Sequence, residues 1–448
     1  MCTDQKDILP VDITIKDLTE EGVLALSSAY GEPEWLRDRR LEAFKAFSDL
    51  EWPHRRVEEW RYTDPARFDL ERVVRTDGGT PAPRTAGVIV AAGDLDGSVA
   101  IVDGEVRDAM VCAEAAERGV VVTDMATAAR DHAEVVGEAL GSAAGTTAKF
   151  DALSLAAFTG SVVVIVPPDV ELARPIGVRV HATGDGAFLP RVLVIAGRHA
   201  KAILYVDHSG DGEATVVETI EAVLAEGAHI DLVTAQDWGD HVDGIANHTG
   251  LVGRQASYRH LEVTLGGRIQ YVRPDVHLVG EGGNGELLGV YFTDEGQHVE
   301  HRSLIHHDAS HTTSNTVYKG ALQGRSRAVW YGNVMIEAHA KQVAADETNR
   351  NLIMSDGARA DSIPFLEIKT SDVASCGHHS SIGQVDAAQL FYLESRGISR
   401  EEAAKLLVFG FFAEITDRID LPGVRETVAA ELEAAVTHGP TSRDPRRG

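Results

Sequence analysis

The central part of the chain alternates short apolar runs with turn residues. Between residues 160 and 370, runs of four to eight residues rich in Val, Ile, Leu and Thr recur, separated by Gly, Asp or Asn and with almost no helical pattern between them. Runs of this length and composition, bounded by turn residues, are typical of β-strands. The clearest predicted strands are residues 161–166, 178–180, 191–195, 202–206, 215–220, 229–233 and 258–265.

The strand positions alone do not determine how the strands are arranged in space. About two hundred residues of short strands fit a sandwich, a barrel or a solenoid. The chain shows no strict sequence period, which excludes a regular Ca²⁺-binding repeat. Small-residue turns at 225–228 and 265–268 favour a β-helix. We therefore expect a mainly β fold with a β-helix core.

Helical patterns flank the β region on both sides. Leu36 and Phe47 belong to an apolar face at helical spacing near the N-terminus, and Asp386 and Ser399 each begin a capping box after the last predicted strand. Pro422 begins a third C-terminal helix. The expected divisions are an N-terminal helical and mixed domain (1–160), a β-helix core (161–384), a C-terminal helical domain (385–437) and a disordered tail (438–448).

Composition and charge narrow the classes of function. The 42 Lys and Arg residues against 69 Asp and Glu residues give a net charge of −27, which disfavours binding to nucleic acid or to anionic membranes. No apolar run approaches the ~18 residues of a transmembrane helix, and the N-terminal residues do not resemble a secretory signal. The three cysteines are few and far apart, as is typical of a reducing compartment. We expect a cytoplasmic protein.

The most distinctive chemistry follows the predicted strand at 366–370. If the backbone through Cys376, Gly377 and His378 is extended, the thiol and the first imidazole point to the same side, with Cβ atoms roughly 7 Å apart. That spacing suits two ligands of a small inorganic centre, and His379 would face the other way. The alternative is a buried free cysteine beside surface histidines. Without any C-x-x-C pair, this chain alone cannot form a permanent thiolate cage.

Other patterns argue against resident catalytic chemistry. The histidines between 298 and 311 lie in a β region, where positions i and i+3 point to opposite faces, and no H-E-x-x-H motif occurs. No G-x-x-x-x-G-K-[ST] phosphate loop is present either. Polysaccharide-cleaving β-helix enzymes need paired carboxylates, and the sequence does not single out a pair. A stand-alone carbohydrate-active enzyme nevertheless stays open as the alternative function.

Several segments resemble, in order, the core signature of the SufB/SufD family of iron–sulfur cluster assembly proteins. These are residues 307–314, 318–320, 349–356, 364–368, 372–378, 391–398 and 410–415. The segment Glu58-Glu59-Trp60-Arg61-Tyr62-Thr63-Asp64 is similar to the SufD branch. One departure is Gly377, because the family has a Ser between the Cys and the His and a Gly-Ala-Thr after them.

The resemblance implies a right-handed parallel β-helix flanked by helical domains, in a non-catalytic scaffold subunit of a SufBCD complex that builds iron–sulfur clusters and passes them to apoproteins. It implies pairing with a SufB-like paralogue through the β-helix, and leaves open a homodimer of the isolated chain. It also implies that no cofactor is bound permanently and that a transient cluster or iron is held at the SufB–SufD interface, with His378 and Cys376 as the ligands from this chain.

The resemblance also implies that the C-terminal helices bind a SufC-like ATPase, which would carry out the ATP hydrolysis. The expected anchors of that docking surface are apolar side chains of the second C-terminal helix, namely Leu406, Phe409, Phe411 and Phe412. The alternative is that all four belong to the core of the helical domain.

Overall fold

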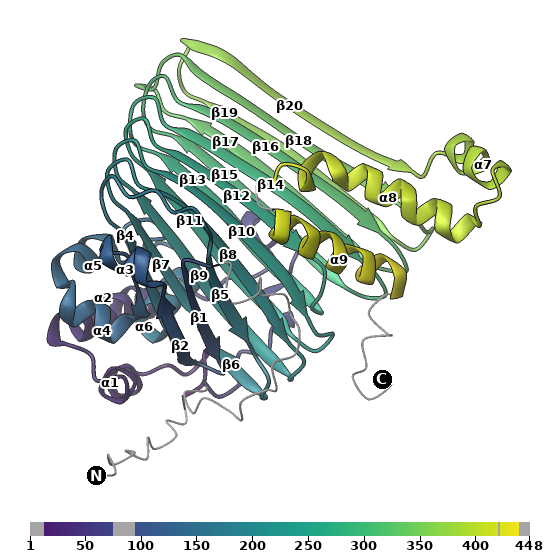
Figure 1. Cartoon of the computed structure of the whole chain (residues 1–448). Coiled ribbons are helices and arrows are strands. Elements are labelled where there is room, and N and C mark those ends of the chain that lie inside the picture. The colour runs from purple at the N-terminus through teal and green to yellow at the C-terminus, as the bar shows by residue number, and fades with distance from the viewer. Residues whose placement is uncertain (1–12, 75–94, 420–421, 439–448) are drawn as a thin grey trace.

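Two β-sheets, wound from one chain into a solenoid, form the body of the molecule (Figure 1). The computed structural model describes residues 13–74, 95–419 and 422–438. From β7 onward, successive long strands alternate between the two sheets, and each pairs in parallel with the strand one coil away. The expected mainly β fold with a parallel β-helix core is therefore confirmed.

Each sheet is a long ladder of hydrogen-bonded strands. The first sheet contains, in spatial order, β2 (Glu105–Val111), β1 (Gly97–Val102), β5 (Ile176–His181), β8 (Lys201–Gly210), β10 (His229–Trp238), β12 (Ser257–Thr264), β14 (Asn284–Thr293), β16 (Thr313–Leu322), β18 (Val343–Ile353) and β20 (Val373–Gln384). The second contains β19 (Arg359–Ile368), β17 (Arg327–Ile336), β15 (His298–His307), β13 (Ile269–Leu278), β11 (Asp243–Val252), β9 (Ala214–Leu224), β7 (Arg191–Ala196), β4 (Ser161–Val166) and β3 (Val121–Asp124), with β6 (Gly186–Phe188) paired to β9.

The coils differ in length, which explains why the sequence has no period. Asp243 pairs with Ile269 across one of the shorter coils. Arg327 pairs with Arg359 across a longer one. Turns between the strands absorb these differences, so the strands stay in register while the sequence spacing drifts.

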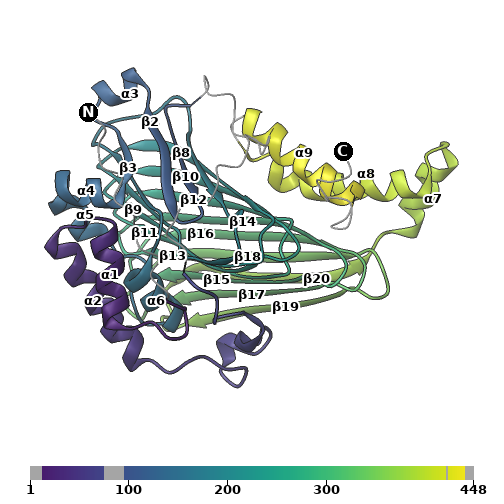
Figure 2. The ribbon, with the colours of Figure 1, turned by 90° about the horizontal axis from the view of Figure 1, so that it is seen from below.

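Most of the described helices cover the outer faces of the two sheets, on opposite sides of the solenoid (Figure 2). The N-terminal ones are α1 (Glu20–Ala29), α2 (Glu34–Asp49), α3 (Ala113–Glu117), α4 (Met125–Asp131), α5 (Ala133–Ala139) and α6 (Lys149–Ala157), with short 3₁₀ turns η1 (Glu58–Trp60) and η2 (Pro65–Arg67). The C-terminal ones are α7 (Ala387–Ser395), α8 (Arg400–Thr416) and α9 (Pro422–His438). None of the described helices is long and apolar enough to cross a membrane.

Strands begin before the expected start of the β-helix core at residue 161. β1, β2 and β3 precede residue 161 and extend the two sheets, so β structure begins at Gly97, inside the expected N-terminal domain. β20 ends at Gln384, the last residue of the expected β-helix core. All but the first residue of the expected disordered tail lies outside the described residues.

The interior of the solenoid contains a buried group of ionisable side chains in its middle coils. His208 Nε2 lies 2.8 Å from Glu218 Oε2, and His248 Nε2 lies 3.1 Å from the same oxygen. Burial alone would raise the pKa of Glu218, but the two imidazoles hold it at about 2. Glu218 in turn raises the pKa of His208 against the opposing effect of burial. Glu218 and His208 therefore form an internal salt bridge.

Glu262, further along the interior, is a different case. Tyr318 donates a hydrogen bond to Glu262 Oε2 at 3.1 Å, and His301 Nε2 lies 3.5 Å from this oxygen. Burial raises the pKa of Glu262 to about 8, although the hydrogen bond from Tyr318 lowers it. Burial lowers the pKa of His301 to about 3. Both side chains are therefore uncharged at neutral pH, and the contact between them is a polar one.

Glycines let large aromatic rings fit inside the coils. Gly289 on β14 pairs with Tyr318 on β16, and a Cβ atom at position 289 would collide with the Tyr318 ring.

We expect Gly289→Ala to lower the free energy of unfolding by about 1–3 kcal/mol, the usual cost of overpacking a core. Chemical denaturation measures this change. Gly383→Ala is the matched control, because a Cβ there meets nothing within 4 Å, and equal losses in the two variants would contradict the packing argument.

Glu262→Gln tests the uncharged state of this carboxyl. A pKa of about 8 in the folded chain lies above the ordinary value of 4.5, so the protonated carboxyl contributes stability that is complete below pH 4.5 and is lost as the pH rises through 8. Gln cannot ionise. Between pH 5 and pH 8 the wild type should therefore lose about 3 kcal/mol relative to the variant, measured by urea unfolding at both pH values. Parallel pH profiles would show that Glu262 is ionised in the folded protein.

Candidate functional site

The solenoid ends at two strands that each have one neighbour among the described strands. β20 is the last strand of the first sheet and β19 the last of the second. In β20, Cys376 pairs with Ala345 and His378 pairs with Glu347. Ala345 and Glu347 are buried and face the interior, and side chains at alternate positions of a strand share a face. Cys376 and His378 therefore face the interior side of the last coil, where no further coil follows.

Inward-facing side chains of this last coil stay partly uncovered. The His378 side chain is 46% exposed, and Ile368 and Ile382 are 42% and 49% exposed. We call this surface, formed by β19 and β20, the open end. Elsewhere in the solenoid the equivalent positions are covered by the next coil, so the open end is an uncovered piece of core with a thiol and an imidazole in it.

The extended backbone separates the two neighbouring histidines. His379 pairs with Thr348 and lies 3.7 Å from Asp346, with its side chain 69% exposed. The structure thus places His379 on the opposite face from His378, as the alternation of a strand predicts. Cys376 is half-buried against a small apolar cluster that includes Val343, so it is neither fully buried nor a free surface thiol.

The surroundings of Cys376 favour its protonated thiol form. Burial raises the pKa of Cys376, and the nearby carboxyls of Glu347 and Asp346 raise it further. Burial also raises the pKa of Glu347 to about 8, against the effect of a hydrogen bond from the Phe365 backbone. A thiolate and a neutral imidazole are both ligands that iron accepts, and a thiol that binds metal releases its proton.

The histidine-rich stretch does not form a metal centre. His298 faces outward and lies 2.6 Å from Thr63, whereas His301 faces the interior. His306 lies beside Glu337, His307 contacts Thr312, and His311 lies in a turn. Across the described ranges, no three His, Cys, Asp or Glu side chains are gathered closely enough to hold a metal ion as they stand.

The apolar side chains of α8 divide between core and surface. Phe412 is buried between the helices and the outer face of the first sheet, and Phe409 and Phe411 pack partly against the same cluster. Leu406 is 44% exposed. As the structure stands, Phe412 belongs to the core and is not available as a docking anchor, so of the four expected anchors Leu406 is the most accessible.

Two aromatic side chains that sequence reasoning missed are more exposed than any expected anchor. Phe391 and Tyr392 on α7 are 71% and 56% exposed, and α7 contacts α8. We call Phe391, Tyr392 and Leu406 the α7–α8 patch. A signal was present in the sequence, because Leu390 faces inward and two adjacent residues after it cannot also share its face of the helix.

The N-terminal segment at 58–64 lies across the outer face of the second sheet. Trp60 is buried and stacks on Tyr271 of β13 with ring centroids 4.2 Å apart. Further along the segment, Thr63 donates a hydrogen bond to Glu300 of β15. The segment therefore connects two coils from outside, and its aromatic and charged residues fix the N-terminal part of the chain to the solenoid.

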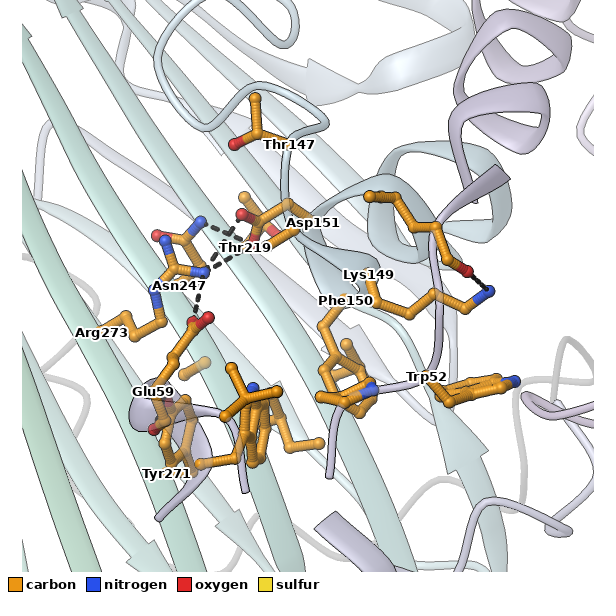
Figure 3. A pocket seen from close by; sticks show the side chains of 18 of the residues that line it. Trp52, Glu59, Thr147, Lys149, Phe150, Asp151, Thr219, Asn247, Tyr271 and Arg273 are labelled. Carbon is orange, nitrogen blue, oxygen red and sulfur yellow. Dashed lines mark hydrogen bonds and ion pairs between the residues drawn. The ribbon is translucent and has the colours of Figure 1, made fainter. Parts of the chain in front are cut away.

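A cavity of about 220 Å³ lies beside this segment, between α6 and the second sheet (Figure 3). Asp151 accepts hydrogen bonds from Asn247 at 2.9 Å and from Arg273 at 3.1 Å, and Arg273 also lies 3.6 Å from Glu59. Lys149 donates to the backbone oxygen of Leu50 at 2.8 Å. These charged side chains already have partners in the chain, so the network serves to attach the N-terminal elements.

Comparisons with known proteins identify the family of the chain. The family model "SUF system FeS cluster assembly, SufBD core domain" matches residues 178–411. An iron–sulfur cluster assembly SufBD family protein of Mycobacterium leprae is 39% identical over 315 residues, which cover 68% of this chain and 80% of the relative. A SufBD family protein of Staphylococcus haemolyticus is 27% identical over 91% of this chain and 90% of its own length. The iron–sulfur cluster assembly protein SufD of Bacillus subtilis is 25% identical over 93% of this chain and 98% of its own length. The chain therefore belongs to the SufBD family of iron–sulfur cluster assembly proteins and is a homologue of SufD.

Proposed function

We propose that the chain is a SufD-like scaffold subunit that assembles iron–sulfur clusters together with a SufB-like paralogue and a SufC-like ATPase. The observation that carries this proposal is the open end, where Cys376 and His378 share an uncovered face. Membership of an iron–sulfur assembly family supports iron and sulfur as the cargo. The chain itself contains no phosphate-loop motif, so ATP hydrolysis is assigned to the partner.

The open end is the surface proposed to receive the paralogue. An edge strand presents backbone donors and acceptors that a second chain satisfies. Ile368 and Ile382 add exposed apolar area, which burial against a second solenoid would stabilise. An interface there places Cys376 and His378 between the two subunits.

The ligand set of this chain suits a transient cargo. A thiolate is a soft ligand and an imidazole is a borderline one, whereas clusters that are held permanently have four protein ligands. Two ligands from this chain leave the remaining positions of iron to sulfur and to the paralogue. The proposed consequence is a cluster that is built at the interface and can leave it.

No observation favours the alternative of a carbohydrate-active enzyme. The buried carboxyls Glu218 and Glu262 lie inside the solenoid, where a polysaccharide has no access. Acid and base groups for glycoside cleavage must flank the scissile bond.

His378→Ala tests the ligand role. Removing the imidazole deletes one ligand without opening a cavity in the apolar core, so the fold should survive. We expect the yield of cluster in a complex reconstituted with the paralogue and the ATPase to fall about tenfold, within the range seen when metal sites are perturbed. Absorbance of the cluster together with iron and sulfide content measures the yield.

His379→Ala is the matched control, because this neighbour faces the opposite side of β20. It should leave the yield within about twofold of wild type. A normal yield with His378→Ala would refute the ligand role, and equal losses in both variants would refute the argument from strand alternation.

The α7–α8 patch is the surface proposed to bind the ATPase. Exposed aromatic side chains supply most of the binding energy at many interfaces, and Phe391, Tyr392 and Leu406 are accessible without unfolding the helical domain. Figure 1 shows α7 projecting beyond the sheet, away from the N-terminal helices. A partner could therefore reach this patch while the open end is occupied by another subunit.

Phe391→Ala should weaken ATPase binding by about 30-fold, the loss that corresponds to ~2 kcal/mol at a hot spot, and should leave the melting temperature unchanged. Phe412→Ala provides the contrast. Its buried ring should cost about 3–5 kcal/mol of stability. Calorimetric titration with the ATPase and thermal melting separate the two effects. Wild-type affinity in both Phe391→Ala and Leu406→Ala would place the docking surface elsewhere.

A further inference from the structure

Glu347 carries a buried carboxyl oxygen that has no hydrogen-bond partner. Its side chain is 1% exposed, and Oε1 makes no hydrogen bond within the described parts of the chain. Buried carboxyl groups in folded proteins, charged or neutral, normally have a hydrogen-bond partner or a bound ion. The Oε1 atom of Glu347 therefore indicates a binding partner that the chain itself does not supply.

This oxygen points toward His378. Oε1 of Glu347 lies 3.9 Å from Nδ1 of His378, and the two residues are direct partners in the β18–β20 ladder. This distance is too long for a hydrogen bond. It is shorter than roughly 4.2 Å, twice the length of a bond from a metal to an imidazole nitrogen or a carboxylate oxygen. One metal ion can therefore contact both atoms without movement of the backbone.

The surrounding backbone leaves room for the carboxylate. Across the interior, Gly332 on β17 faces Glu347, and a Cβ atom at 332 would lie 2.6 Å from Glu347 Oε2. A larger residue at 332 would push the side chain away. The absence of a side chain at this position keeps the carboxylate beside the open end, on the same face as Cys376 and His378.

We propose that Glu347 is a metal ligand at the open end, and that it binds iron jointly with His378. The inference rests on the proposed function for the identity of the metal and adds a residue that neither the motif nor the family assignment singles out. A carboxylate oxygen beside an imidazole is a common pair of ligands for ferrous iron, and the Glu347 carboxyl releases its proton to solvent when the metal binds. Cys376, on the same face of β20 as His378, is the soft ligand available to the cluster as sulfur arrives.

Asp346, which precedes Glu347 and lies on the outer face of β18, is not buried and does not lie beside His378. Its side chain is 50% exposed and lies 3.7 Å from His379 on the opposite face. The two carboxyl groups are adjacent in the sequence and each lies beside a histidine, but Glu347 is buried on the inner face of the strand and Asp346 is exposed on the outer face. This difference makes Asp346→Asn a matched control for Glu347→Gln.

The test uses Co²⁺, whose absorption spectrum reports its ligands, as a probe for ferrous iron. The full chain, alone and in complex with its paralogue, is titrated with Co²⁺ as wild type, Glu347→Gln, Asp346→Asn and His378→Ala. We expect Glu347→Gln and His378→Ala each to weaken Co²⁺ binding at least about tenfold, and Asp346→Asn to stay within twofold of wild type. Glu347→Gln should also melt at or above the wild-type temperature, because it removes an unpartnered buried acid, so its lost affinity cannot come from unfolding.

Two outcomes would overturn the inference. One is Co²⁺ affinity in Glu347→Gln within twofold of wild type, and the other is no saturable Co²⁺ binding by the wild type in either form. A different result would contradict the proposed function. If His378→Ala assembles clusters normally while Glu347→Gln and His378→Ala both weaken Co²⁺ binding, the metal site stands and its role in cluster assembly does not.

Discussion

Parallel backbone pairing between strands one coil apart is the constraint on which the rest of this molecule depends. It stacks each inward-facing side chain against the side chain at the matching position of the next coil, as with Ala345 and Cys376. The surroundings of a residue are therefore set by residues about one coil away and not by its neighbours in sequence. The same pairing brings Glu347 on β18 to His378 on β20 and builds an interior in which polar groups such as Glu262 are held away from water.

Features that depend on local pattern could be predicted from the sequence. Strand positions follow from the alternation of apolar residues, and the starts of α7 and α8 follow from capping residues. Asp386 accepts a hydrogen bond from the backbone of Ala388, and Ser399 accepts one from Glu402. The shared face of Cys376 and His378 is local in the same sense, because it needs only an extended backbone.

Features that depend on strand register, or on which apolar face of a helix packs against the sheet, could not be predicted from the sequence. The coils vary in length, so no period in the sequence aligns Glu347 with His378. The helix α8 has apolar residues on more than one face, and only the position of the sheet decides that Phe412 packs inward while Leu406 does not. The sequence therefore predicts an apolar helix correctly and cannot tell which of its residues is free to bind a partner.

The two ends of the solenoid are not alike. At the C-terminal end, β19 and β20 pair in parallel with the strands before them, whereas at the other end β2 and β3 run antiparallel to their neighbours. Head-to-tail stacking would place a parallel coil against antiparallel edges, which have a different hydrogen-bond spacing. Two open ends that met would be related by a twofold rotation, with the same surface of each chain in the contact. Such a contact covers both open ends, so a third chain cannot add at that edge.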